Sequence, residues 1–374
     1  MTTDELAKRF QANHLRLVAA RDRLHGLVEA GTATPAERKR LDTVQELLTP
    51  VTSTELDSTG KLVQVSRARQ FLHVDPDGQG RAVEVLGELD AAGNVAVLVP
   101  GMGNSLDTFR DQSDRGNLIQ QEAGPGTAVV VWLDYPSPPD IPAAISPAPA
   151  QEAGPQLAKF LAEVDGIKPV TAKLTVIGHS YGSVVTGYAL RAGARADRVV
   201  LTGSPGAGRG VDAAAELVPP GTSLYVERAP GDVVSYTQWH GPDPANYSDA
   251  VRMATNAPGA DPVRGHDEYY RTNTESLRNI GRVIRGDLSR ITTTATSAAA
   301  ETRVLPWLSW SEPVRIAAQA VSKVYDGMTA LTKATRHAVR SAGGGAGGRA
   351  GGTAATTEKR RSTDRPRRPG GPDR

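Results

Sequence analysis

The sequence contains no cysteine among its 374 residues. That absence excludes disulfide bonds, thiolate metal sites and a cysteine nucleophile, and it leaves the redox compartment open. The sequence also has no large excess of either charge, because 43 basic and 41 acidic residues leave a net charge of +2. A balance this even gives no overall field that would favour nucleic acid or a membrane. We therefore expect catalysis, if any, to use oxygen or nitrogen groups, and we expect no nucleic-acid partner.

Long apolar runs are absent as well. No stretch approaches 18 uncharged apolar residues, and the first ten residues, MTTDELAKRF, are polar rather than a basic start followed by an apolar run. These features predict a soluble protein that is not exported by the general route, and hence a cytoplasmic location. The length allows one large domain with appendages.

The N-terminal region, residues 1–60, is predicted to be a helical hairpin. Apolar residues recur at helical spacing between residues 4 and 30. A second helix is indicated by Thr34, Pro35 and Glu37, which supply a capping hydroxyl, a proline at the first helical position and a glutamate at the third.

Residues 61–290 are predicted to form an α/β domain. A strand pair is expected at 70–74 and 82–89, joined by the turn Asp75-Pro76-Asp77-Gly78. Nearly continuous apolar runs, typical of parallel strands buried on both faces, then follow at 95–99, 128–133, 174–177, 199–201 and 224–226. Helical stretches separate them at 106–122, 151–164 and 184–192. This alternation predicts a mostly parallel, doubly wound sheet.

The C-terminal region is predicted to lie outside that domain. Residues 291–340 are interpreted as a linker followed by an amphipathic helix with basic residues around its apolar face. Residues 341–374 are Gly-rich and then basic, and we expect them to be disordered. A basic amphipathic helix could lie on an anionic membrane surface, although such helices more often dock onto their own domain.

Gly178-His179-Ser180-Tyr181-Gly182 matches the G-x-S-x-G nucleophile elbow. The pattern alone is weakly specific in a glycine-rich chain, but here a predicted strand runs into it and a predicted helix leaves it, as the elbow requires. We therefore predict Ser180 as a nucleophile. His179, inside the elbow, is expected to point its ring away from the serine.

A serine hydroxyl needs a histidine to accept its proton and a carboxylate to orient that histidine. Asp232 follows the strand predicted at 224–226 and is the expected acid. His240 and His266 compete as the base. His266 is favoured, because 251–254 could supply one more strand before it, whereas His240 is only eight residues after Asp232.

The predicted oxyanion hole consists of the backbone N–H groups of Tyr181 and of Met102, in the glycine-rich loop after the strand at 95–99. Glycine-rich loops also cradle phosphates, but neither this loop nor Gly206–Gly210 carries a Walker lysine or a full dinucleotide fingerprint. The histidines and carboxylates show no metal-ligand spacing. We predict no cofactor and no metal.

In combination, five blocks of the sequence resemble an actinobacterial α/β-hydrolase domain family of unknown function. The blocks are Val97–Asn104, Val131–Pro136, Gly178–Ser183, Gly203–Gly206 and the motif HGPDP at His240–Pro244. The resemblance covers about residues 60 to 285. It implies an α/β-hydrolase fold with a serine, an aspartate and a histidine at Ser180, Asp232 and His266, and it implies no substrate.

The first function predicted is a serine hydrolase of carboxylic esters, such as lipid or acyl esters, with Tyr236 and Trp239 lining an apolar substrate site. An amidase, a peptidase or an acyltransferase would use the same residues. Residues 233–262 could form a lid or pocket wall over the serine. The alternative is a non-catalytic binding or scaffold protein on a hydrolase fold, associated with a membrane surface through the basic C-terminal helix. The sequence leaves the oligomeric state open.

Overall fold

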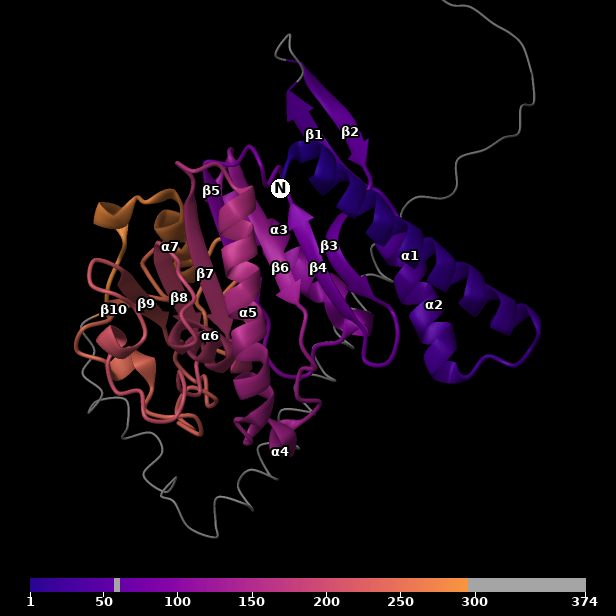
Figure 1. Cartoon of the computed structure of the whole chain (residues 1–374). Helices are drawn as coiled ribbons and strands as arrows, with labels where there is room; N and C mark the ends of the chain where they lie inside the picture. The colour runs from indigo at the N-terminus through magenta and orange to yellow at the C-terminus, as the bar shows by residue number, and fades with distance from the viewer. Residues whose placement is uncertain (57–60, 295–374) are drawn as a thin grey trace, which may run out of the picture. The chain divides into compact units, whose positions relative to one another are not determined.

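The computed structural model describes residues 1–56 and 61–294, and the side chains of 52–56 and 62–63 are not described (Figure 1). Its centre is an eight-stranded sheet with the strand order β10-β9-β8-β7-β5-β6-β4-β3. From β10 to β6 the neighbouring strands are parallel, whereas β6 to β4 and β4 to β3 are antiparallel pairs. The strands are β3 (Gln70–Asp75), β4 (Arg81–Leu86), β5 (Asn94–Val99), β6 (Thr127–Leu133), β7 (Lys173–His179), β8 (Arg198–Thr202), β9 (Ser223–Glu227) and β10 (Val251–Met253).

The parallel strands are buried because their sequences are apolar on both faces. All seven residues of β6 are buried, and so are five of the six residues of β5. Helices must cover both faces of such a sheet, since neither face can be left to water. The predicted doubly wound α/β fold is confirmed for this part of the chain.

Helices lie on the two faces of the sheet in packed pairs. α5 (Ala148–Ile167) packs against α6 (Tyr181–Arg191), and α3 (Phe109–Ala123) packs against α7 (Glu275–Arg285). Figure 1 shows α5 in front of the sheet and α7 behind it. Shorter helical segments are η1 (Leu106–Thr108), α4 (Ile141–Ala144), η2 (Ala214–Glu216), η3 (Pro244–Asn246) and η4 (Leu288–Arg290). The sequence predictions did not include α4 or α7.

The predicted N-terminal hairpin is present as α1 (Thr3–Glu29) and α2 (Pro35–Leu48), which pack against each other (Figure 1). Each helix begins with a capping box, formed by Thr2 with Glu5 and by Thr34 with Glu37. α1 also packs against β3, and its buried leucines belong to the same hydrophobic core as the sheet.

A second, two-stranded antiparallel sheet was not predicted. It consists of β1 (Val51–Leu56) and β2 (Leu62–Arg67). The domain boundary predicted at residue 60 lies between these two paired strands. The C-terminal linker, amphipathic helix and tail were predicted for 291–374. Residues 291–294 are described, and Thr293 forms an antiparallel bridge with Met253 of β10, whereas 295–374 lie outside the described residues. Among the described helices, none is long and apolar enough to cross a membrane.

Candidate active site

Ser180 lies on the sharp turn between β7 and α6. Its backbone has φ of +56° and ψ of −129°, a conformation that costs energy for any residue with a Cβ. The turn lies tightly against the end of β5, since a Cβ atom at Gly182 would be only 2.1 Å from the carbonyl oxygen of Val99. The turn therefore requires glycine there, and it directs the serine side chain toward the carboxyl edge of the sheet.

Asp232 lies on the turn after β9, and it is 1% exposed. Its carboxylate accepts hydrogen bonds from Tyr269 Oη at 2.6 Å, the Val234 amide at 3.0 Å, Ser235 Oγ at 3.1 Å and His266 Nδ1 at 2.9 Å. Burial raises the pKa of this carboxyl, but the charge of His266 and these hydrogen bonds outweigh burial and hold the pKa at about 2. Asp232 is thus an anion at neutral pH.

His266 lies on the loop between β10 and α7, with a side chain that is 9% exposed. Burial lowers the pKa of its imidazole, whereas the charge of Asp232 and the hydrogen bond to it raise the pKa, and the net direction is upward. Because Nδ1 donates to Asp232, the neutral ring carries its acceptor on Nε2.

The serine and the Asp232–His266 pair meet at the ends of three adjacent strands. The Ser180 amide donates to the Thr202 carbonyl at the end of β8. A Cβ at the next residue, Gly203, would lie 2.8 Å from Asp232 Oδ2 and 3.0 Å from His266 Nδ1. The turns after β7 and β9, together with the loop between β10 and α7, therefore bring the three predicted triad residues to one region of the sheet edge.

His179 has a role that the sequence prediction missed. Its buried ring packs beside that of His266, with centroids 5.0 Å apart, and its Nε2 donates to the backbone carbonyl of His266 at 2.9 Å. Burial, the neighbouring His266 and Arg115 lower the pKa of His179 to about 3, so its ring is neutral. The residue before the serine thus holds the loop that carries the histidine.

An ion pair between Arg115 on α3 and Asp267 on the same loop braces that loop. Arg115 Nη2 donates to Asp267 Oδ1 at 2.9 Å, and Nη1 faces His179 Nδ1 at 3.4 Å. The guanidinium also lies over the Tyr270 ring, 5.8 Å from its centroid. No sequence motif marks these contacts, because they join residues 152 and 64 positions apart.

The loop after β5, predicted to supply part of an oxyanion hole, lies directly beside the serine. A Cβ at Gly101 would be 2.7 Å from Ser180 Cβ and 3.0 Å from Ser180 Oγ. The Gly101 carbonyl accepts from Asn104 Nδ2 at 2.8 Å and from Ser137 Oγ at 2.9 Å. Within the described residues the Met102 and Tyr181 amides donate to no other group. The loop is thus held beside Ser180 through the Gly101 carbonyl.

His240, the alternative base, packs its ring edge-on against that of Tyr181, with centroids 5.3 Å apart, and its hydrogen bond goes to a group other than Asp232. It is fully buried, and Nε2 donates to the Ala144 carbonyl at 2.7 Å. Burial lowers its pKa. In the same HGPDP motif, Asp243 forms a buried ion pair with Arg228 at 2.5 Å and caps η3 through the Ala245 amide. The HGPDP motif, to which the sequence assigned no role, thus connects separate segments through buried hydrogen bonds and an ion pair.

The two aromatic residues proposed to line a substrate site, Tyr236 and Trp239, are both half-buried. They lie in the turns that follow Asp232. Tyr236 stacks under the Arg228 guanidinium, 5.0 Å from the ring centroid. Part of the segment 233–262 belongs to the central sheet. It contains β10, which pairs with β9 at the sheet edge, where the sequence predicted a further strand at 251–254.

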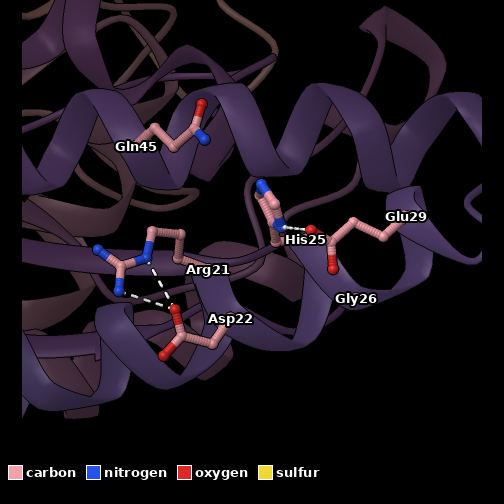
Figure 2. A pocket seen from close by; sticks show the side chains of 6 residues that line it. All are labelled: Arg21, Asp22, His25, Gly26, Glu29 and Gln45. Atoms are coloured by element: carbon pink, nitrogen blue, oxygen red, sulfur yellow. Dashed lines mark hydrogen bonds and ion pairs between the residues drawn. The ribbon is translucent and has the colours of Figure 1, made fainter.

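A separate hollow on the helical hairpin contains charged residues but no arrangement for catalysis. Figure 2 shows it, lined by Arg21, Asp22, His25, Gly26, Glu29 and Gln45. Its charges pair locally, Arg21 with Asp22 at 2.7 Å and His25 with Glu29 at 3.2 Å, and all four side chains are more than a third exposed. Across 1–56 and 61–294, no group of three or more histidines and carboxylates could hold a metal ion.

Comparison with known proteins finds matches to the central part of the chain. Residues 75–241 match the model of a family described as alpha/beta hydrolase. The uncharacterized protein Rv2079 of Mycobacterium tuberculosis is 32% identical over 249 residues, which are 56% of this chain and 37% of that protein. The uncharacterized protein Mb0988c of Mycobacterium bovis is 30% identical over 134 residues, 32% of this chain and half of that protein. This chain thus matches little more than a third of the first relative's length.

Solved structures with a similar arrangement include two esterases. One from Rhizomucor miehei has 17% identity and a TM-score of 0.35, covering 75% of this chain and 96% of that one. A thermostable esterase from Pseudomonas putida has 16% identity and a TM-score of 0.34, covering 72% and 95%. At these scores they identify no substrate for this chain.

Proposed function

We propose that this protein is a serine hydrolase of carboxylic esters, from the premise that residues 75–241 match the model of the alpha/beta hydrolase family. The observation that carries the proposal is the 2.9 Å hydrogen bond from His266 to Asp232, at the strand ends where the strained Ser180 lies. This arrangement supplies a nucleophile, a base and an orienting anion.

In the first half of the proposed reaction, Ser180 Oγ attacks the ester carbonyl carbon while its proton moves to His266 Nε2. The carbonyl oxygen becomes an oxyanion that accepts hydrogen bonds from the amides of Met102 and Tyr181. His266 then gives its proton to the leaving alkoxide as the carbon–oxygen bond breaks, which leaves an acyl group on the serine.

In the second half, water attacks the acyl-enzyme and its proton moves to His266. Collapse of the second tetrahedral intermediate releases the acid and returns the proton to Ser180. Asp232 keeps the imidazole in one tautomer throughout and stabilises its cationic form. We propose Tyr236 and Trp239 as walls of the acyl or alcohol site, because both are half-buried on the segment after Asp232.

The test is labelling with a fluorophosphonate probe, which reacts with a serine activated by a base and an oxyanion hole. We expect the wild type to be labelled, Ser180→Ala not to be labelled, and Ser248→Ala, which changes an exposed serine outside the site, to be labelled as the wild type is. Asp232→Asn is expected to slow hydrolysis of p-nitrophenyl esters on the order of 10³- to 10⁴-fold. Labelling of Ser180→Ala at the wild-type rate would contradict the assignment of the nucleophile. A well-folded wild type without labelling would instead favour a non-catalytic binding protein.

A further inference from the structure

The N-terminal hairpin lies outside residues 75–241, yet one of its side chains enters the hydrolase domain. Arg40, on α2, has a side chain that is 11% exposed. Its guanidinium bonds to both carboxylate oxygens of Asp107, with Nε to Oδ1 at 2.6 Å and Nη2 to Oδ2 at 3.2 Å. It also donates to the carbonyls of Pro76 and Gly78 in the turn between β3 and β4. Arg40 thus joins two segments of the domain to the hairpin.

This pairing is suited to holding a fixed geometry. A guanidinium presents its donors in a rigid planar fork, so a carboxylate bound by two of them has little freedom to rotate. Thr43 Oγ1, also on α2, adds a third bond to Asp107 Oδ1 at 3.2 Å. Burial raises the pKa of Asp107, but the hydrogen bond and the charge of Arg40 lower this pKa by more than burial raises it. The carboxyl is therefore ionised at neutral pH. The hairpin therefore holds Asp107 as a half-buried anion.

Asp107 lies in η1, immediately after the loop that faces Ser180. The turn and η1 are bonded to each other, because the Leu106 amide donates to the Gln79 carbonyl at 3.2 Å. Gln79 Nε2 donates to the Ser137 carbonyl at 2.9 Å. Ser137 in turn binds the Gly101 carbonyl through its hydroxyl at 2.9 Å. Arg40 thus anchors the β3–β4 turn and η1, and these two segments lie next to the loop after β5.

Asn104 completes the connection, three residues before Asp107. Its Nδ2 donates to the carbonyls of Gly101 at 2.8 Å and Met102 at 3.2 Å. Its Oδ1 accepts from Gln112 Nε2 on α3 at 2.7 Å. Both side-chain ends of Asn104 are used, so the orientation of the Met102 peptide depends on where Asn104 and η1 lie.

We propose that Arg40 is a positioning residue for the oxyanion hole, through which the N-terminal hairpin holds the Gly101–Asn104 loop in its catalytic geometry. The inference rests on the proposed function, because it assigns to Met102 the oxyanion contact of that reaction. Arg40 itself touches neither the serine nor the substrate. Misplacing one oxyanion donor removes stabilisation that exists only in the transition state, so the effect falls on kcat rather than on KM.

The test compares Arg40→Met with Arg23→Met in the full chain. Arg23 is the matched control, because it also joins the hairpin to the β3–β4 turn, through Asp77 at 2.7 Å, but its side chain is 53% exposed and reaches no group beside the loop. We expect Arg40→Met to lower kcat for p-nitrophenyl acetate and the rate of fluorophosphonate labelling about tenfold. We expect an unchanged KM and unchanged acid limb of the pH profile. Arg40→Lys should recover part of the loss, and Arg23→Met should match the wild type.

A second readout does not depend on activity. Hydrogen exchange measured by mass spectrometry should show faster exchange in peptides covering 100–107 of Arg40→Met, with unchanged exchange in peptides covering β7. Asp107→Asn, which keeps the shape of the side chain, should act in the same direction if Arg40→Met does not fold. A normal kcat together with unchanged exchange at 100–107 would overturn the inference and leave the proposed function intact. A wild type that neither labels nor hydrolyses esters would overturn the proposed function, and faster exchange would then show only that Arg40 holds the loop.

Discussion

At the scale of the residue, the feature that governs the chemistry is the environment of His266. Four charged or titratable groups surround its imidazole: Asp232 from the turn after β9, Asp267 beside it on the same loop, Arg115 from α3 and His179 from β7. The buried Tyr269 hydroxyl also reaches Asp232. Both carboxylates raise the pKa of His266 and Arg115 lowers it, against the lowering effect of burial.

We therefore predict that the acid limb of the kcat/KM profile lies above pH 6.5. The base must be neutral to accept the serine proton, so activity rises as pH increases through the raised pKa. Asp267→Asn should move the limb to lower pH, and Arg115→Met should move it to higher pH, because they remove charges of opposite sign. The measurement is kcat/KM for a p-nitrophenyl ester between pH 5 and 9, with the exposed Asp261→Asn as control. Shifts of the same sign in the two variants would contradict this electrostatic account.

A second residue-scale feature is a buried acid that holds a proton. Ser276 Oγ donates its single proton to the Tyr269 carbonyl at 2.9 Å, and it also lies 2.5 Å from Glu227 Oε2. Because a carbonyl cannot donate, the proton in the second contact must come from Glu227. Burial raises the pKa of Glu227 well above its ordinary value, which agrees with this geometry.

From this protonation we predict a loss of stability with rising pH. The unfolded chain releases the Glu227 proton near pH 4.5, whereas the folded chain keeps it, so the unfolding free energy falls as pH rises from that value through the raised folded pKa. Glu227→Gln keeps a donor toward Ser276 and should lose less stability between pH 5 and pH 8 than the wild type. Urea unfolding at both pH values measures this, with the exposed Glu88→Gln as control. Equal losses in Glu227→Gln and in the wild type would show that Glu227 is not the titrating group.

At the scale of the element, the HGPDP motif connects the sheet edge to the segment after Asp232. Arg228, directly after β9, pairs with Asp243, and their side chains are 3% and 2% exposed. Burial raises the pKa of Asp243 more than Arg228 lowers it, so the pair is sensitive to loss of the cation. This ion pair holds the segment that carries Tyr236 and Trp239 to the strand that presents Asp232.

Arg228→Met is predicted to destabilise the fold by about 3–5 kcal/mol, because it leaves a buried carboxylate without its partner. Arg271→Met removes an exposed ion pair with Glu268, whose side chains are 49% and 35% exposed, and should cost less than about 1 kcal/mol. Urea unfolding at pH 7 compares the two variants with the wild type. Equal small losses in both variants would argue that Asp243 finds another partner.

At the scale of the whole molecule, the described part of the chain has one hydrophobic core that includes both the hairpin and the sheet. Leu17 on α1 is fully buried and belongs to this core, whereas Leu15, two residues away, is 58% exposed. α1 packs against β3, so the hairpin covers the edge of the sheet that lies farthest from β10. The hairpin and the hydrolase domain are thus expected to unfold together.

Leu17→Ala is predicted to lower the unfolding free energy by about 2–5 kcal/mol, because it leaves a cavity in a shared core. Leu15→Ala should change it by less than about 0.5 kcal/mol. Urea transitions followed by far-UV circular dichroism and by tryptophan fluorescence should coincide in the wild type and in both variants. Separate transitions for the two probes would indicate that the hairpin unfolds independently.

The local sequence determined most of the elements, because their causes are local. Apolar runs predict β5 to β9, and capping boxes and helical spacing predict α1 and α2. α7 has a similar local signal: Thr274 caps it, Gly286 follows it, and Leu277, Ile280, Val283 and Ile284 lie at helical spacing. β1 and β2 were not predicted, because their sequences, VTSTEL and LVQVSR, contain several polar residues and form no apolar run.

Ser180 could be assigned from the sequence because the elbow needs glycines at fixed positions around it. The choice between His240 and His266 could not be settled in the same way, because both follow Asp232 and only the folded chain shows which ring reaches the carboxylate. The contacts of His179, Arg115 and Arg40 had no signal in the sequence, since each joins residues far apart in the chain. Spacing along the chain determined which residue types the protein places at the strand ends, whereas the packing of separate elements decided which of them meet.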